Sequence, residues 1–108
     1  MRNTYVQTLY ELAKADDKIF CLIADIGAFI LGDFKREFPG RFLNMGIAEA
    51  NMIGVASGLA LCGKTPFAYT IAPFVTSRCY DQIKVDVCYQ NLNVKIIGVG
   101  GGIAYGSL

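Results

Sequence analysis

The sequence of 108 residues contains no histidine and no tryptophan. Without histidine, the chain lacks the side chain that most often acts as a general base near neutral pH. It can build neither a Ser-His-Asp triad nor most kinds of zinc site. Any acid–base chemistry must therefore be carried by a carboxylate, a tyrosine, a lysine or a bound cofactor.

An excess of charge of one sign and long apolar runs are also missing. Ten basic and nine acidic residues give a formal net charge of +1, without a run of either sign. The sequence therefore gives no support for binding to nucleic acid or to a membrane surface. The apolar stretch 53–63 is well short of the ~20 residues that span a bilayer. Nothing resembles a signal peptide, so we expect a cytoplasmic protein.

The apolar fraction of 54% is high for a chain of this length, which has room for one domain, residues 1–108. Surplus apolar surface predicts a partner. The cysteines form no CxxC pair and no metal-ligand spacing, which indicates core thiols of a cytosolic protein rather than disulfides or a metal site. They are Cys21, Cys62, Cys79 and Cys88.

Hydrophobic periodicity predicts helices that alternate with strands. A capping-box pattern at Thr4 and Gln7 precedes an amphipathic helix that ends near residue 16. A second helix is expected from Glu49 until Gly63 breaks it, and a third at 74–89; residues 25–40 form an irregular or briefly helical connector. Strands are expected at 19–24, 41–44, 67–71 and 94–99. This order predicts an α/β fold, a three-layer sandwich with a mostly parallel, doubly wound sheet.

Ligands of such sheets lie beyond the carboxyl ends of the strands. Asp25, the pair Pro73 and Phe74, and the glycines at 100–102 are expected to share that rim. The glycine-rich segment 98–106 matches GxGxxG in no register, and no P-loop is present. The segment therefore predicts close backbone approach to something, but not a dinucleotide site.

Glu49 is a charged residue at the start of an otherwise almost entirely apolar helix. Apolar side chains around most of the circumference predict a buried helix. Burial disfavours the charged form of a carboxyl group, and perturbed carboxyls are frequent at functional sites. The alternative is a first-turn residue that faces water and interacts with the helix dipole, a contribution of ~0.3–1 kcal/mol. The physical argument alone leaves both interpretations open.

Several motifs then occur in a recognisable order along nearly the whole chain. They are Ala24-Asp25 after the first strand, FPGRF at 38–42, RFLN-x-GIAE at 41–49, GKTPF at 63–67, and Phe74 followed by RCYDQI at 78–83. Together they resemble the pyrimidine-binding domain of transketolase-like thiamine diphosphate enzymes. The 1-deoxyxylulose-5-phosphate synthases and the beta subunits of 2-oxoacid dehydrogenase E1 components share much of this pattern.

The resemblance implies roles for five residues. Glu49 would hydrogen-bond N1′ of the cofactor's aminopyrimidine and promote the imino tautomer that deprotonates the thiazolium. Phe74 would stack on the pyrimidine, Asp25 would lie near the cofactor or the domain interface, and Arg78 would bind a phosphorylated substrate. Plainer alternatives are a core phenylalanine, a turn residue and a solvated helix face, respectively. Tyr69 either lines the pocket or packs as an ordinary strand residue.

The resemblance also implies what the sequence does not supply. Family members hold the diphosphate and its divalent metal, Mg²⁺ or Ca²⁺, in a separate domain. We therefore expect half of a transketolase-type site, truncated at its C-terminal end and inactive alone. A diphosphate-binding subunit or domain would complete it in a homo- or hetero-oligomer that transfers two-carbon ketol units between sugar phosphates. A fragment of a 1-deoxyxylulose-5-phosphate synthase or of an E1 beta subunit, and a non-catalytic interaction domain, remain alternatives.

Overall fold

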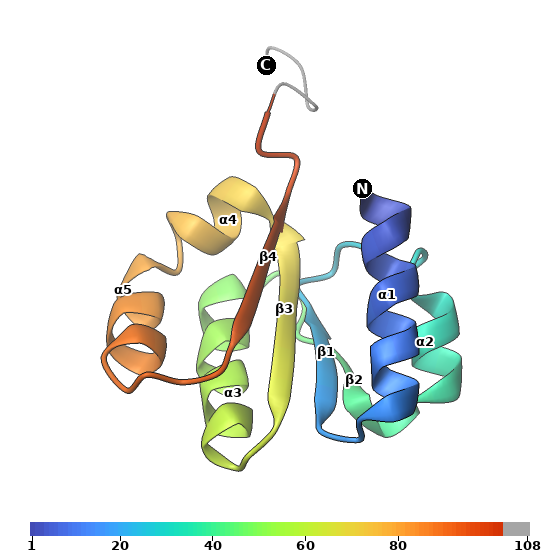
Figure 1. Cartoon of the computed structure of the whole chain (residues 1–108). Coiled ribbons are helices and arrows are strands. Elements are labelled where there is room, and N and C mark those ends of the chain that lie inside the picture. Colours follow the sequence, from blue (N-terminus) through green and yellow to red (C-terminus); the bar gives the residue numbers. More distant parts are fainter. Residues whose placement is uncertain (103–108) are drawn as a thin grey trace.

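A four-stranded parallel sheet lies between two layers of helices in the computed structural model, which describes residues 1–102 (Figure 1). The strand order is β2-β1-β3-β4. The predicted α/β sandwich is therefore confirmed, and the end of the glycine-rich segment lies outside the described residues. The strands are β1 (Ile19–Ile23), β2 (Phe42–Asn44), β3 (Thr65–Ile71) and β4 (Lys95–Val99).

The helices divide between the two faces of the sheet. On one face lie α1 (Arg2–Ala15) and α2 (Gly32–Glu37), and a short 3₁₀ turn (Pro39–Arg41) leads from α2 into β2. On the other face lie α3 (Glu49–Leu61), α4 (Ala72–Thr76), α5 (Tyr80–Gln82) and a π-helical segment (Ile83–Cys88). No helix within residues 1–102 is long and apolar enough to span a membrane.

Strand β1 is buried on both sides, which explains its unbroken apolar run. Ile19, Cys21 and Ile23 pack in the core beneath α1 and α2. Leu22, with Ala24 just beyond the strand, packs in the second core beneath α3. One central strand therefore joins two hydrophobic cores.

Two sequence expectations about helices are wrong. Helix α1 begins at Arg2 with Met1 as its N-cap, so Thr4 lies inside the helix and does not cap it. The helix expected at 74–89 is broken between α4 and α5 and ends in a π-helical segment. Its inward-facing residues recur every fourth position, at 75, 79, 83 and 87, whereas an α-helix would rotate them by about 40° per repeat. The break and the wider π-turn keep them facing one core.

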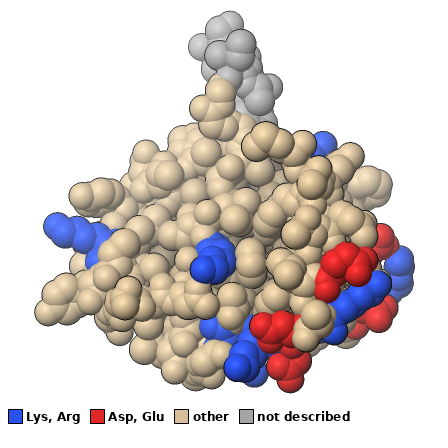
Figure 2. Space-filling model, in the orientation of Figure 1, with Lys and Arg blue, Asp and Glu red and all other residues tan. Residues whose placement is uncertain are grey.

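Apolar side chains remain exposed around the carboxyl end of the sheet and along the last helical segments. Phe29 is 97% exposed and Ile47 is 77% exposed, while Tyr80 and Tyr89 are exposed on the helical side. Figure 2 shows that, on the face drawn, Asp and Glu gather on the side of α1 and α2.

Candidate functional site

A small cavity of about 200 Å³ lies at the carboxyl ends of β1 and β3. The helix that follows β1 packs on one face of the sheet and the helix that follows β3 on the other, so this is the topological switch point where α/β sheets bind ligands. A cavity of this size suits one small ring rather than a whole nucleotide. Its lining is Ala24, Asp25, Ile26, Ile47, Glu49, Thr70, Ile71 and Phe74.

Glu49 is the first residue of α3, and its side chain is 5% exposed. The alternative interpretation, in which Glu49 faces water, therefore does not hold. The N-cap residue Ala48 offers no side-chain hydrogen bond to the helix, so the Glu49 carboxylate is the negative group nearest the positive end of the dipole. Its two oxygens lie 3.4 and 3.3 Å from Nη1 of Arg78, which donates to both.

Arg78 connects the carboxylate with the aromatic wall. Its guanidinium carbon lies 3.7 Å from the centroid of the Phe74 ring, a cation–π distance. The Arg78 side chain is 51% exposed, so it neither belongs to the core nor lies fully in solvent. Glu49, Phe74 and Arg78 form a connected group, which we call the Glu49 cluster.

Asp25 lies at the rim of the cavity in a left-handed backbone conformation, with φ of 54°. Its backbone N–H donates to Oδ1 of Asn44 at 3.1 Å, and Nδ2 of Asn44 donates to its carboxylate at 3.0 Å. Oδ1 of Asn44 also accepts from the N–H of Gly46 at 3.0 Å. In the sequence, Asn44 stood out only as part of a motif, with no role of its own.

Thr70 is a second residue that no sequence motif selects. It is 1% exposed and lines the cavity, yet its hydroxyl has no hydrogen-bond partner in the part of the chain that the structure describes. Buried hydroxyls are rarely left unpaired, so an orphan beside Glu49 fits a site that receives a polar ligand. A threonine inside a strand is ordinary in sequence, and no local signal marked this one.

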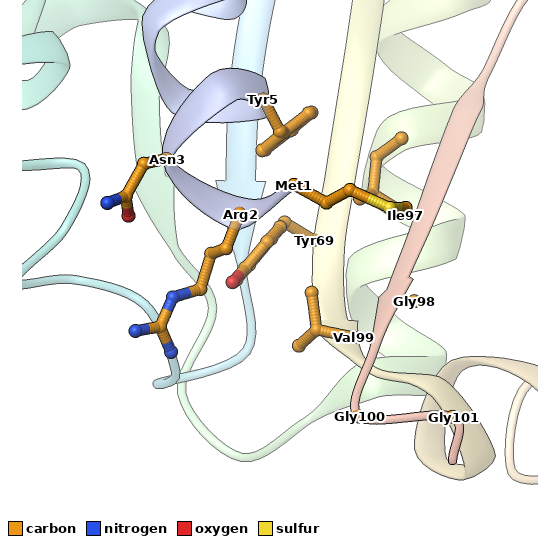
Figure 3. Close-up of a pocket in the computed structure, with 10 residues that line it drawn as sticks. All are labelled: Met1, Arg2, Asn3, Tyr5, Tyr69, Ile97, Gly98, Val99, Gly100 and Gly101. Carbon is orange, nitrogen blue, oxygen red and sulfur yellow. The ribbon is translucent and has the colours of Figure 1, made fainter. Parts of the chain in front are cut away.

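Tyr69 points to the opposite face of the sheet. Its ring stacks on Tyr5 of α1 with centroids 5.5 Å apart, and it lines a larger groove of about 940 Å³ between α1 and β4 (Figure 3). Gly100 and Gly101 line the same groove. The structure therefore brings Asp25, Glu49 and Phe74 together and places Tyr69 and the glycines at another hollow. None of the described residues that line this groove is acidic, so it offers no carboxylate for proton transfer.

Cys79 follows the cluster directly and is buried. Burial raises the pKa of the Cys79 thiol, and the negative charge of Glu49 raises it further, while Arg78 lowers it. The thiol therefore stays protonated near neutral pH and is a poor nucleophile. Its Sγ donates to the carbonyl oxygen of Phe74 at 3.4 Å, a structural contact that holds α4.

The donor set of the cavity suits an organic ring rather than a metal. A buried carboxylate, an aromatic side chain and an unpaired hydroxyl fit a planar heterocycle with a ring nitrogen, such as the aminopyrimidine of thiamine diphosphate. Within residues 1–102 there is no group of three His, Cys, Asp or Glu side chains that could hold a metal ion.

Curated relatives match almost the whole chain. One subunit of the apulose-4-phosphate transketolase of Phocaeicola vulgatus is 44% identical over 108 residues, which is 99% of this chain and 35% of the relative. The 6-deoxy-6-sulfo-D-fructose transketolase subunit SqwH of a Clostridium species is 46% identical over 104 residues, 95% of this chain and 32% of the relative. A 1-deoxy-D-xylulose-5-phosphate synthase from Clostridium perfringens is 40% identical over 95 residues, 87% of this chain and 15% of that enzyme.

A solved structure and a family sequence profile point to the same family as these relatives. A solved structure described as "Split gene transketolase, inactive beta4 tetramer" superposes with a TM-score of 0.82 at 46% identity, over 90% of this chain and 33% of that one. This chain thus spans about a third of the length of its transketolase relatives. The sequence profile of the family described as transketolase, pyrimidine binding domain, matches residues 1–107. The chain therefore belongs to the transketolase family and carries the pyrimidine-binding domain of that family.

Proposed function

We propose that the chain supplies the pyrimidine-binding half of a thiamine diphosphate-dependent transketolase, which transfers two-carbon ketol units between sugar phosphates. The observation that carries the proposal is the buried carboxylate of Glu49, placed beside Phe74 at the switch point of the sheet. Transketolase relatives depend on thiamine diphosphate in general, and the cavity has the size and donors for its aminopyrimidine.

In this proposal, the Glu49 carboxyl group hydrogen-bonds N1′ of the aminopyrimidine and holds a proton there. Phe74 stacks on the ring, a contact that contributes ~0.5–1.5 kcal/mol beyond burial. Asp25 and the Thr70 hydroxyl supply polar contacts at the rim and wall. When bound, thiamine diphosphate supplies a carbon acid whose conjugate base attacks the carbonyl of a ketose.

Arg78 has two possible partners in this scheme. In the structure its guanidinium is engaged by Glu49 and Phe74, and its half-exposed side chain can turn outwards. We propose that the phosphate of a sugar substrate draws Arg78 away when the pyrimidine takes its place beside Glu49. Guanidinium groups suit this task because they bind phosphate bidentately.

A second polypeptide would complete the site. Residues that could bind the diphosphate and its Mg²⁺ or Ca²⁺ would come from a diphosphate-binding subunit of transketolase type, and the assembly would be cytoplasmic. A divided enzyme is supported by two relatives that are named as transketolase subunits and by the solved structure of a split gene transketolase. Ile47, which is exposed and lines the cavity, would meet that partner, and this chain alone would be inactive.

The substrate stays open because two relatives of similar identity are named for different sugars. A 1-deoxyxylulose-5-phosphate synthase activity is the second candidate, favoured by the 40% identity to such an enzyme. Both candidates use Glu49 in the same way, so they differ in substrate and share the cofactor chemistry.

The test is to combine the chain with a diphosphate-binding transketolase subunit and to measure ketol transfer. Glu49→Gln keeps the shape but removes the acid, so we expect kcat to fall by roughly 10²–10⁴-fold while the complex still assembles. Glu37→Gln, a change at an exposed residue at the end of α2, is the matched control and should retain wild-type kcat. Equal activity of Glu49→Gln and Glu37→Gln would refute the role of Glu49.

A further inference from the structure

The side chain of Asn44 connects two loops that reach the cavity from different strands. Asn44 ends β2, Asp25 follows β1, and Gly46 begins the turn into α3. One amide group makes three hydrogen bonds at 3.0–3.1 Å: its oxygen accepts from the N–H groups of Asp25 and Gly46, and its nitrogen donates to the Asp25 carboxylate. We call this arrangement the Asn44 clamp.

An amide is the group that this geometry requires. The oxygen must accept two backbone N–H groups while the same side chain donates to a carboxylate, and an aspartate at this position could only accept. Both residues that the clamp holds have positive φ, 54° for Asp25 and 70° for Gly46. Glycine adopts a positive φ readily, whereas at Asp25 this conformation persists because neighbouring groups hold it, and the Asn44 amide is the group that contacts it.

The clamp also contacts the turn that precedes α3. The N–H of Ala48 donates to the carbonyl oxygen of Gly46 at 2.8 Å. The N–H of Met52 then donates to the carbonyl oxygen of Ala48 at 2.9 Å, where the helix begins. The N-cap makes no side-chain hydrogen bond of its own. The turn that Asn44 contacts therefore leads directly into the start of the helix and the Glu49 carboxylate.

We propose that Asn44 is a positioning residue that fixes Asp25 and Glu49 relative to each other across the cavity. This proposal rests on the proposed function, because Glu49 is the group that it places. Asn44 itself does not line the cavity, so its effect on the ligand is transmitted through the two residues that do.

The experiment exchanges donor and acceptor in the clamp. Asn44→Asp sets two carboxylates against each other, Asp25→Asn sets two amides against each other, and the double variant restores a donor opposite a carboxylate. Control variants that make the same two exchanges elsewhere are Asn93→Asp, at an exposed position just before β4, and Asp17→Asn, in an exposed turn. Two quantities are measured by NMR: the affinity for 4-amino-2-methylpyrimidine, and, without ligand, the amide shifts of residues 46–49.

We expect Asn44→Asp to lower the affinity about tenfold or more, since small displacements of reacting groups are costly, and to shift the amides of residues 46–49. The double variant should recover these shifts and most of the affinity, while both controls match the wild type. A merely structural role would lower the melting temperature but leave the affinity of the folded protein unchanged, which would overturn the proposal. So would a double variant as weak as Asn44→Asp.

The two NMR measurements distinguish a failure of the proposed function from a failure of the positioning role. If the wild type binds no aminopyrimidine either alone or with a diphosphate-binding subunit, the proposed function fails, while the amide shifts still report whether Asn44 sets the start of α3. If Asn44→Asp does not fold, Asp25→Gly removes the carboxylate that accepts from Nδ2 of Asn44, suits the positive φ of this position, and gives the readout. Unchanged shifts at 46–49 in Asp25→Gly would then contradict the positioning role.

Discussion

The pairing of Glu49 with Arg78 should be measurable as a coupling free energy. Two unit charges at 3.3 Å attract by about 5 kcal/mol at an effective dielectric constant of 20, but desolvation offsets most of this. Exposed pairs are worth ~0.2–1 kcal/mol, and breaking a fully buried pair costs ~3–5 kcal/mol. Because Glu49 is buried and Arg78 is half exposed, we expect a coupling of about 1–2 kcal/mol.

The assay is urea unfolding of the wild type, Glu49→Gln, Arg78→Met and the double variant at pH 7. Arg78→Met alone should be the least stable of the four, because it leaves the buried carboxylate without its cation. The control cycle uses the exposed pair of Arg36 and Asp33 on α2, for which we expect at most ~0.5 kcal/mol. Additivity of the Glu49 and Arg78 changes within about 0.3–0.5 kcal/mol would refute the pairing.

Two further predictions follow from buried groups. Thr70→Val keeps the shape of the side chain and removes the unpaired hydroxyl. It should raise the free energy of unfolding by about 1 kcal/mol in urea titrations and weaken aminopyrimidine binding. A loss of stability would show that the hydroxyl has a partner. Burial raises the pKa of the Cys21 thiol from 9.0 to about 12, so this thiol ionises at lower pH in the unfolded chain than in the folded one. The free energy of unfolding should therefore fall between pH 9 and 12, by at most about 1.4 kcal/mol per pH unit from this group. Cys21→Ala should make this alkaline slope shallower, and an unchanged slope would contradict the assignment.

The elements that the sequence predicted well carry their signal locally. The unbroken apolar run at 19–24 and the apolar helix from Glu49 become β1 and α3, because strands and helices buried on all sides need no amphipathic pattern. The four-residue spacing from Val75 to Val87 was visible as well. Its interpretation as a regular α-helix was wrong, since that spacing fits a wider turn.

The site was harder to predict because adjacent residues of a strand face opposite sides. Tyr69 and Thr70 both lie in β3, which is buried on both faces. No alternation of polar and apolar residues therefore shows which of the two side chains faces which side of the sheet. The sequence pattern left Tyr69 as either a pocket residue or a packed strand residue; in the structure Thr70 lines the switch-point cavity and Tyr69 lines the groove on the other face. The Asn44 clamp was invisible for another reason, since its hydrogen bonds join residues 19 positions apart.

The most direct test of the central claim is to map where an aminopyrimidine binds. The measurement is a ¹H–¹⁵N NMR titration of the chain with 4-amino-2-methylpyrimidine, read at assigned amides. The account predicts shifts at Ala24, Glu49, Thr70 and Phe74, which line the switch-point cavity, and their loss in Glu49→Gln. Shifts confined to residues of the larger groove, such as Tyr69 and Ile97, would contradict it.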